Sequence, residues 1–547
     1  MSDNQRFPAT RFVTLPLVAA LLAPTMAADW RFPTVLLYGV GLFLILVASL
    51  SLLRQLSPRV ETIVFAAFVI LSIIKLLIFE ATGLHINFFL LSLIGEFSGR
   101  EWWIMVQKAV TYLPGVIAIS FLILYLVRRL NIHYVQLPAP WLLALGVIFA
   151  AMAELTISFF FLTGDPRATA LRRDLAFHIS PHPYHLRKAA DYLGVDAGGN
   201  PFATPLATQA NDGTSPPPLS LDLPLNPQSI VLLVADSMRS KDLERDTTIA
   251  PTMAERESVR LKLRHNAVSN CTHFSFYTML YGRYPSGFSA ARQNRQPAPF
   301  ITALRKEGYD IQSFEAHSLD WYDTRELTVG DDIPIFKSNK IDFFKADEET
   351  VSQAISAIEQ NTSQPYFYLV YLYGTHWPYG TERSTTPLQE KYEKAVSHID
   401  SQVGRLISSI DQLPENNRPV LIATSDHGEE IGDQFGHSSR LSEEQLYVPL
   451  AVYGLPDGNM PTSHLDLLPF LQNVVSRRPH TAQTGPEIMM QCNYDFPTEF
   501  RVRTAVYDIS FRMENRILSP LPSMEPSSNN SRYQREAFRL LLEAINN

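Results

Sequence analysis

Four predominantly apolar stretches of the chain stop at an acidic residue or a histidine, and this pattern constrains the fold more than any other. The stretches run from residue 229 to Asp236, from 309 to His317, from 366 to His376 and from 420 to Asp426 and His427. Continuous apolar runs are typical of strands covered on both faces, as in a parallel sheet flanked by helices. Ligand sites in such sheets lie beyond the carboxyl ends of the strands. We therefore expect these side chains to converge at one rim.

The segments between the predicted strands have the composition of helices, and the two kinds of element alternate from residue 228 onward. Helices are predicted near 250–255, 300–308, 346–358 and 388–413. This alternation predicts a doubly wound α/β domain over residues 228–475. Residues 476–547 predict a small antiparallel β unit followed by a terminal helix at 533–545.

Residues 1–163 are poor in charge and contain five long apolar segments, at 12–28, 32–53, 62–81, 106–127 and 141–162. Most approach the ~20 residues that a transmembrane helix needs, so we predict a five-helix transmembrane domain. The first segment is short and contains two prolines, and a cleaved signal peptide is the alternative for it. Arginines flank alternate ends of the segments, which places the N-terminus in the cytoplasm. The soluble part would then face the periplasm from a multi-pass position in a bacterial inner membrane.

Residues 164–227 form a basic periplasmic linker between the two predicted domains. Its first half contains Arg172, Arg173, Arg187 and Lys188, and its second half is rich in proline and small polar residues. A basic segment beside a membrane attracts anionic lipid headgroups, although a solvated linker explains the charges equally well. The net charge of the chain is −8, and no basic stripe interleaved with aromatic residues is present, so no nucleic-acid partner is expected.

The residues at the predicted rim have the donor types of a divalent metal site. Asp426 and His427 are adjacent and offer an oxygen and a nitrogen, Asp236 ends a neighbouring run, and His437 follows ten residues after His427. This set suits Zn²⁺, Mn²⁺ or Mg²⁺ as the cofactor. Taken singly, each residue has a plainer interpretation, such as a helix cap for Asp236 or a structural histidine. His376 is assigned to catalysis, and His317 is expected to line the site.

Cys271 and Thr272 lie in a predicted loop, residues 269–273, that leads into a helix through Gly282, and one of them is the candidate nucleophile. A hydroxyl or thiol at a helix N-terminus benefits from the free N–H groups, which also bind an anionic ester. The alternative is a buried cysteine followed by a capping threonine. Cys492 is the one other cysteine of the chain. We expect Cys271 to lie unpaired at the rim rather than in a disulfide with Cys492.

Several motifs together resemble the sulfatase branch of the alkaline phosphatase superfamily over residues 229–475. They are IVLLVADS, LYGRYP, GTHWPY, TSDHGE with GHSS, and SHLDLLPFL, in that order. Five predicted spans ahead of such a domain resemble lipoteichoic acid synthases and lipid A phosphoethanolamine transferases. The basic linker resembles that of the YejM family of inner-membrane proteins of lipopolysaccharide homeostasis. This resemblance implies that Asp236, Asp426 and His427 are metal ligands and that Arg187 and Lys188 contact lipid A.

The chain departs from the sulfatase pattern at two places. Cys271 lies where sulfatases have their modified cysteine, but the proline and arginine of the maturation pattern do not follow it. One acidic residue, Asp236, ends the first strand where sulfatases have two, which is closer to the transferases, whose nucleophile is a threonine. The hypothesis is therefore a metal-dependent phosphoester hydrolase or headgroup transferase of the envelope. The alternatives are a lipid A phosphoethanolamine transferase and a non-catalytic lipid A sensor that regulates lipopolysaccharide synthesis through an inner-membrane partner protein.

Overall fold

The computed structural model describes residues 32–57, 59–60, 63–64 and 139–162, and residues 219–546 apart from ten short gaps. These gaps are 296, 362–363, 381–385, 432–435, 439, 456–457, 493–496, 498, 515–516 and 522–530. The chain divides into two compact units, Met1–Gly199 and Asn200–Asn547. The predicted four-part division of the chain stays a prediction.

Two helices of the first unit, α2 (Phe32–Leu56) and α7 (Ala139–Leu162), coincide with the second and fifth predicted membrane segments. They pack closely because both helices have glycine where they meet. A Cβ atom on Gly41 would lie 2.8 Å from the backbone nitrogen of Ala150, and one on Gly146 would lie 2.9 Å from the carbonyl oxygen of Gly41. Glycines at this contact therefore allow the two backbones to approach.

The other membrane predictions fall on parts of the chain of which little or nothing is described. The segments 12–28 and 106–127 lie outside the described residues, as does nearly all of 62–81 and the whole basic stretch with Arg172, Arg173, Arg187 and Lys188. Within the described residues, no helix combines the length and the apolar character that crossing a membrane requires. The count of five spans stays a prediction.

The second unit contains a seven-stranded sheet with the order β2-β7-β6-β1-β5-β3-β4. The strands are β1 (Ile230–Ala235), β2 (Val259–Asn266), β3 (Asp310–Glu315), β4 (Ile335–Lys337), β5 (Tyr366–Leu372), β6 (Val420–Ser425) and β7 (Tyr447–Tyr453). β1 lies at the centre, parallel to β5 and β6, and every residue of these three strands is buried. The predicted α/β fold is confirmed, and the unbroken apolar runs are the strands covered on both faces.

The sheet is mixed rather than parallel, which corrects the prediction. β7 runs antiparallel to both β6 and β2. The cause is the path of the chain after β6, because the described residues between 426 and 446 include the four-residue helix α18 (Glu443–Leu446) and no long crossover helix. Without a crossover, β7 starts at the same rim where β6 ends and must run back along it.

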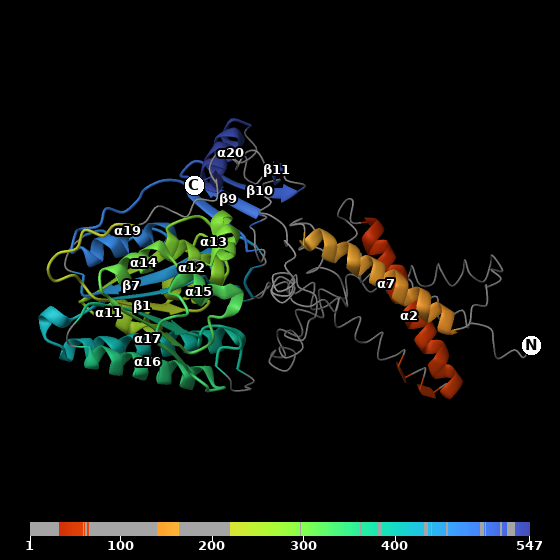
Figure 1. Ribbon diagram of the computed structural model, residues 1–547, viewed down its shortest axis with the longest axis horizontal. Coiled ribbons are helices and arrows are strands. Elements are labelled where there is room, and N and C mark those ends of the chain that lie inside the picture. Colours follow the sequence, from red (N-terminus) through yellow and green to blue (C-terminus); the bar gives the residue numbers. More distant parts are fainter. Residues whose placement is uncertain are drawn as a thin grey trace, which may run out of the picture. The chain divides into compact units, whose positions relative to one another are not determined.

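Helices cover both faces of this sheet, as Figure 1 shows. The long helices α16 (Phe343–Gln360) and α17 (Leu388–Gln412) lie on one face, and α12 (Thr272–Tyr281), α14 (Pro299–Lys306) and α19 (His464–Val475) lie on the other. In α17, residues Val396, Ile399 and Val403 are buried at the three- and four-residue spacing of one helix face. Shorter helices complete the layers: α10 (Lys241–Arg245), α11 (Pro251–Glu255), α13 (Phe288–Asn294) and α15 (Thr324–Thr328).

The chain ends in a four-stranded antiparallel sheet with the order β11-β10-β9-β8, packed against the helix α20 (Ser531–Asn546). The strands are β8 (Glu487–Met490), β9 (Glu499–Arg503), β10 (Asp508–Glu514) and β11 (Ile517–Pro520). Phe500 and Val502 of β9 are buried with Phe511 of β10 and Leu541 of α20. This alternation gives the small sheet one apolar face, and the terminal helix covers it.

Candidate metal and nucleophile site

Asp236 and Asp426 are brought together by the register of two central strands. β1 and β6 are parallel, and their last residues, Ala235 and Ser425, are partners. The next residue of each strand therefore leaves the sheet at the same level of the same rim. One ligand atom from each of Asp236, Asp426 and His427 lies within 4.8 Å of the others, and all three residues are buried. The predicted convergence of these three side chains is thus observed.

The two oxygens of Asp426 have different surroundings. Its Oδ1 accepts hydrogen bonds from the backbone N–H groups of Ser237 (3.0 Å) and His427 (2.8 Å). Its Oδ2 is buried, accepts no hydrogen bond from the described residues, and lies 3.6 Å from Nε2 of His427. Burial, together with the negative charge of Asp236, raises the pKa of Asp426 to about 8. A carboxylate in this position lacks a positive partner.

Asp236 is held in its charged form by its neighbours. Its Oδ1 accepts a hydrogen bond from the Ser237 hydroxyl (2.7 Å), and its Oδ2 accepts one from the Tyr371 hydroxyl. Burial alone would raise the pKa of Asp236. Electrostatic interactions with His376, His427 and His437, together with the Tyr371 hydrogen bond, outweigh this effect, so the pKa of Asp236 is lowered.

His427 presents one ring nitrogen to both carboxylates. Its Nδ1 lies 3.0 Å from the carbonyl oxygen of Gly428 and donates a hydrogen bond to it, which leaves Nε2 unprotonated in the neutral ring. That Nε2 lies 3.9 Å from Oδ1 of Asp236. Burial lowers the pKa of His427 and favours the neutral ring, the form that binds metals. A Cβ on Gly428 would lie 2.0 Å from the carbonyl oxygen of Glu444, so no other residue fits there.

This cluster fits a divalent cation. Two carboxylates and one neutral imidazole form a mixed oxygen and nitrogen set that suits Zn²⁺ or Mn²⁺. A cation would also provide the positive partner that Oδ2 of Asp426 lacks. Three protein ligands are typical of catalytic metal sites, which keep a further position for a substrate. The donor set is therefore compatible with the predicted metal, although its identity stays open.

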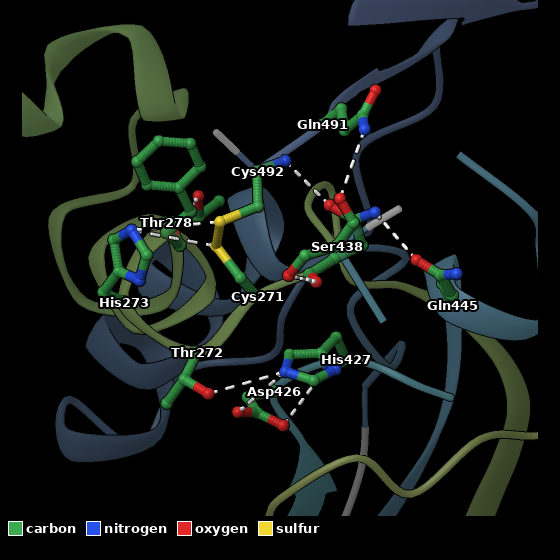
Figure 2. Close-up of a disulfide and its surroundings, with 12 residues drawn as sticks. Cys271, Thr272, His273, Thr278, Asp426, His427, Ser438, Gln445, Gln491 and Cys492 are labelled. Atoms are coloured by element: carbon green, nitrogen blue, oxygen red, sulfur yellow. Dashed lines mark hydrogen bonds and ion pairs between the residues drawn. A yellow bond between two sulfur atoms is a disulfide. The ribbon is translucent and has the colours of Figure 1, made fainter. Parts of the chain in front are cut away.

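Thr272 places a hydroxyl beside this cluster. It is the first residue of α12, and its Oγ1 is 3.4 Å from Nε2 of His427. Figure 2 shows Thr272 pointing toward His427 and Asp426, whereas the side chain of Cys271 points toward Cys492. The first N–H groups of a helix have no partner within the helix, so they can bind an anion beside this hydroxyl.

The prediction of an unpaired Cys271 was wrong, because Cys271 forms a disulfide with Cys492. The chain has two cysteines, so neither is a free thiol. A disulfide sulfur is not a thiolate and cannot act as the nucleophile or be converted to a modified sulfatase residue. Of the two candidate nucleophiles, this leaves Thr272.

The other predicted histidines line one side of the cluster. The ring of Tyr373 stacks between those of His317 and His376, with ring centroids 4.2 and 4.3 Å apart. The His437 ring lies 4.4 Å from that of His427 and 5.5 Å from that of His376. His437 is thus beside the cluster, but it is not among the three residues whose ligand atoms converge. Its role as a metal ligand and the catalytic role of His376 stay predictions.

Sequence reasoning missed three residues that support the site. Tyr371 donates to Asp236, and Tyr373 orders the histidine stack; they are two residues apart in and just after β5 and share one face of it. Glu429 is buried, accepts a hydrogen bond from Tyr379 (2.9 Å), and lies 3.5 Å from Nδ1 of His437. The two-residue spacing of the tyrosines, and the position of Glu429 within the TSDHGE motif, were the available signals.

Asp347 of α16 holds the loop that carries His376. Its two carboxylate oxygens accept hydrogen bonds from the backbone N–H groups of Tyr373 (2.8 Å) and Gly374 (3.0 Å). The hydroxyl of Thr375 then donates to the backbone oxygen of Asp236 (2.6 Å). The loop after β5 is therefore fixed on both sides before it reaches the histidine.

Comparison with known proteins supports the family indicated by the motifs. A sequence model of the sulfatase family matches residues 228–474. Over these residues the chain is similar to the sulfatase family. Inner membrane protein YejM of Salmonella typhimurium is 22% identical over 245 residues, which is 44% of this chain and 40% of YejM. The chain thus matches less than half the length of YejM. Iduronate 2-sulfatase of Homo sapiens is 34% identical over 88 residues, 15% of this chain and 16% of that protein.

Among solved structures, the membrane protein lipooligosaccharide phosphoethanolamine transferase A of Neisseria meningitidis overlaps with a TM-score of 0.44. It is 12% identical in sequence, and the overlap covers 86% of this chain and 95% of that one. The resemblance of the chain to YejM-like proteins of the sulfatase branch is therefore confirmed by the sulfatase-family match and the YejM relatives.

Proposed function

We propose that the sulfatase-family domain is a metal-dependent phosphoester hydrolase or headgroup transferase with Thr272 as its nucleophile. The observation that carries the proposal is the position of the Thr272 hydroxyl, at a helix N-terminus and 3.4 Å from Nε2 of His427 in the carboxylate–histidine cluster. Asp236, Asp426 and His427 would hold the metal. When bound, the metal would lower the pKa of the hydroxyl and offset the charge of the phosphate.

The remaining residues supply binding and proton transfer. Phosphate oxygens would contact the first-turn N–H groups of α12, where the helix dipole favours negative charge. Oγ1 of Thr272 would form a bond to phosphorus and lose its proton to solvent while the bond to the leaving oxygen breaks. His376 donates from Nδ1 to the carbonyl oxygen of Trp377 (2.8 Å), which directs Nε2 to proton exchange with the leaving group. Water or an acceptor hydroxyl would then release the phosphoryl group from Thr272.

The reaction class can be tested with three chromogenic probes on the purified full chain supplied with Mn²⁺ or Zn²⁺. The probes are bis(p-nitrophenyl) phosphate, p-nitrophenyl phosphate and p-nitrophenyl sulfate. We expect turnover of a phosphate ester and none of the sulfate ester, because the disulfide removes Cys271 from formylglycine chemistry. Turnover of the sulfate alone, or of none of the three, contradicts the proposal.

We also propose that the chain is a multi-pass protein of a bacterial inner membrane with the sulfatase-family domain in the periplasm. The support is the arginine pattern of residues 1–163 and the similarity to YejM, which is named an inner membrane protein. Alkaline phosphatase is active only outside the cytoplasm. Fused after Ala210 it should be active, and fused after Leu130 it should be inactive. The reverse pattern would contradict the predicted topology.

A second function, lipid A binding by a sensor, is favoured by the basic linker alone. If Arg187 and Lys188 contact lipid A phosphates, charge-assisted hydrogen bonds of roughly 1.5–3 kcal/mol each are involved. Replacing both by alanine should weaken binding of lipid A vesicles at least about tenfold. The double variant Lys340→Ala/Lys345→Ala is the matched control. Both lysines are exposed, and their replacement removes the same number of positive charges at positions far from the linker in sequence. Equal binding by both double variants would exclude this segment from the lipid site.

A further inference from the structure

Residues 490–492, at the end of β8, are here called the clamp segment. They lie beside the nucleophile loop, residues 268–272, which carries Thr272. The backbone N–H of Met490 donates to the carbonyl oxygen of Val268 (2.8 Å). Two residues later, the N–H of Cys492 donates to Oδ1 of Asn270 (2.8 Å). The Cys271–Cys492 disulfide follows, so the contact ends in a covalent bond directly before Thr272. The clamp segment thus contacts the nucleophile loop at Val268, Asn270 and Cys271, and Figure 2 shows the disulfide between Cys271 and Cys492.

The same segment also holds the loop that carries His437. The Ser438 hydroxyl donates to the carbonyl oxygen of Asn270 (3.1 Å), and Nε2 of Gln491 donates to the carbonyl oxygen of Ser438 (3.2 Å). Ser438 has a positive φ of 64°, a conformation that needs support from its surroundings. Two loops at the rim therefore depend on one short strand end, although they are more than 160 residues apart in sequence.

The disulfide replaces the usual means of fixing the start of a helix. Cys271 is the N-cap residue of α12, and its side chain makes no capping hydrogen bond. An N-cap is ordinarily serine, threonine, aspartate or asparagine, whose oxygen binds a free N–H of the first turn. Here the side chain is joined to Cys492 instead. The position of the first turn, and of Thr272 within it, is therefore set by the covalent bond.

The loop before the helix also contains backbone strain. Val268 has a φ of 65°, which is unfavourable for a β-branched residue. Its N–H donates to Oδ1 of Asn266 (2.7 Å), and its carbonyl oxygen accepts from Met490. A strained loop persists only while its neighbours hold it, so cutting its covalent anchor allows it to relax.

We propose that the Cys271–Cys492 disulfide is a redox-sensitive clamp that positions Thr272 against the carboxylate–histidine cluster. The inference rests on the proposed role of Thr272. A dithiol would supply two electrons and two protons: the sulfur–sulfur bond breaks, two thiols form, and the dithiol becomes a disulfide. The oxidised protein is then the active form, and the reduced protein has a loosely held nucleophile. Cys271 acts in this scheme as a positioning residue.

The test compares oxidised and reduced full-length protein with bis(p-nitrophenyl) phosphate as the probe. Because the chain has two cysteines, a reductant acts on this one bond, and thiol titration gives the reduced fraction. A nucleophile displaced by about 1 Å can lose 10²-fold in rate, so we expect kcat to fall about tenfold or more with little change in KM. Reoxidation should restore kcat.

The double variant Cys271→Ser/Cys492→Ser is the control for effects of the reductant on the metal. Its kcat should match that of the reduced wild type and should not change when dithiothreitol is added. If the variant does not fold, a phosphine reductant, which lacks thiols, serves the same purpose with the wild-type protein. Unchanged kcat in fully reduced protein, or a disulfide that the reductants do not open in the native protein, overturns the proposal.

Amide hydrogen exchange separates failure of the clamp from failure of the proposed function. On reduction, we expect faster exchange at residues 268–275 and 490–492, with α16 and α17 unchanged. If the oxidised protein turns over no phosphate ester, the proposed function fails, and the exchange data still decide whether the disulfide orders the loop. Equal exchange in both redox states would overturn the clamp even in an active enzyme.

Discussion

Thr272→Ala should lower kcat for a phosphate ester at least ~10³-fold, which corresponds to about 4 kcal/mol in the activation barrier. The expectation follows from the position of the hydroxyl, 3.4 Å from Nε2 of His427 and at the first residue of α12. Removing a covalent nucleophile removes the reaction path itself, not only one contact. Steady-state kinetics on the full chain with bis(p-nitrophenyl) phosphate measure the effect.

Two variants make this result specific. Thr272→Ser keeps a hydroxyl at the same place and should retain part of the activity. Thr278→Ala changes a buried threonine of the same helix, whose hydroxyl donates to the carbonyl oxygen of Phe274 (2.8 Å), away from the cluster. It should leave kcat near the wild-type value. Mass spectrometry of rapidly quenched protein should find phosphoryl on the peptide that contains Thr272. Substantial turnover by Thr272→Ala would exclude the covalent role.

The centre of the fold could be predicted because its signal is local. The runs that end at Asp236 and Asp426 are predominantly apolar, a pattern typical of strands covered on both faces, and both strands are buried at every position. Once both strands are parallel neighbours, their ends must meet at one rim, so the convergence of Asp236, Asp426 and His427 follows. His317 and His376 were placed near the same rim by the same argument.

The direction of β7 could not be predicted from its own residues. Its seven residues are buried just as those of β1 are, and a buried strand has the same composition in either direction. The direction depends on whether the preceding connection crosses the sheet, and in the described part of residues 426–446 the short helix α18 takes the place of a crossover helix.

The disulfide was missed because it depends on tertiary contacts between distant segments. Cys271 and Cys492 are 221 residues apart, and their approach requires β8 to end beside the nucleophile loop. Spacing within the sequence does not report on such a contact. The prediction placed Cys271 at the rim, facing the metal. Instead, Thr272 faces the cluster, and the side chain of Cys271 is directed to the clamp segment.

Asp426→Asn should abolish stoichiometric retention of Mn²⁺ or Zn²⁺ by the full chain. The substitution keeps the oxygen that accepts from Ser237 and His427, and it removes the negative charge at the oxygen without a partner. An amide is a much weaker ligand than a carboxylate for these ions. We expect at least about a hundredfold loss of metal affinity, or roughly 2.7 kcal/mol, by titration calorimetry, with metal content measured after gel filtration.

Asp400→Asn is the matched control, because Asp400 is also buried and also accepts two backbone N–H groups, from Thr252 (2.9 Å) and Met253 (2.8 Å). It lies outside the cluster, so this variant should lose stability but keep its metal.

Stability measured without metal should rank the two variants the other way round, with Asp426→Asn the less affected. Without a cation, Asp426 and Asp236 are two buried carboxylates side by side, and Asp426→Asn relieves that repulsion. Metal-free Asp426→Asn should therefore unfold at the same temperature as metal-free wild type or higher, and added metal should raise Tm only for the wild type and Asp400→Asn. Full metal retention by Asp426→Asn would remove the cluster as the metal site, and with it the proposed activation of Thr272.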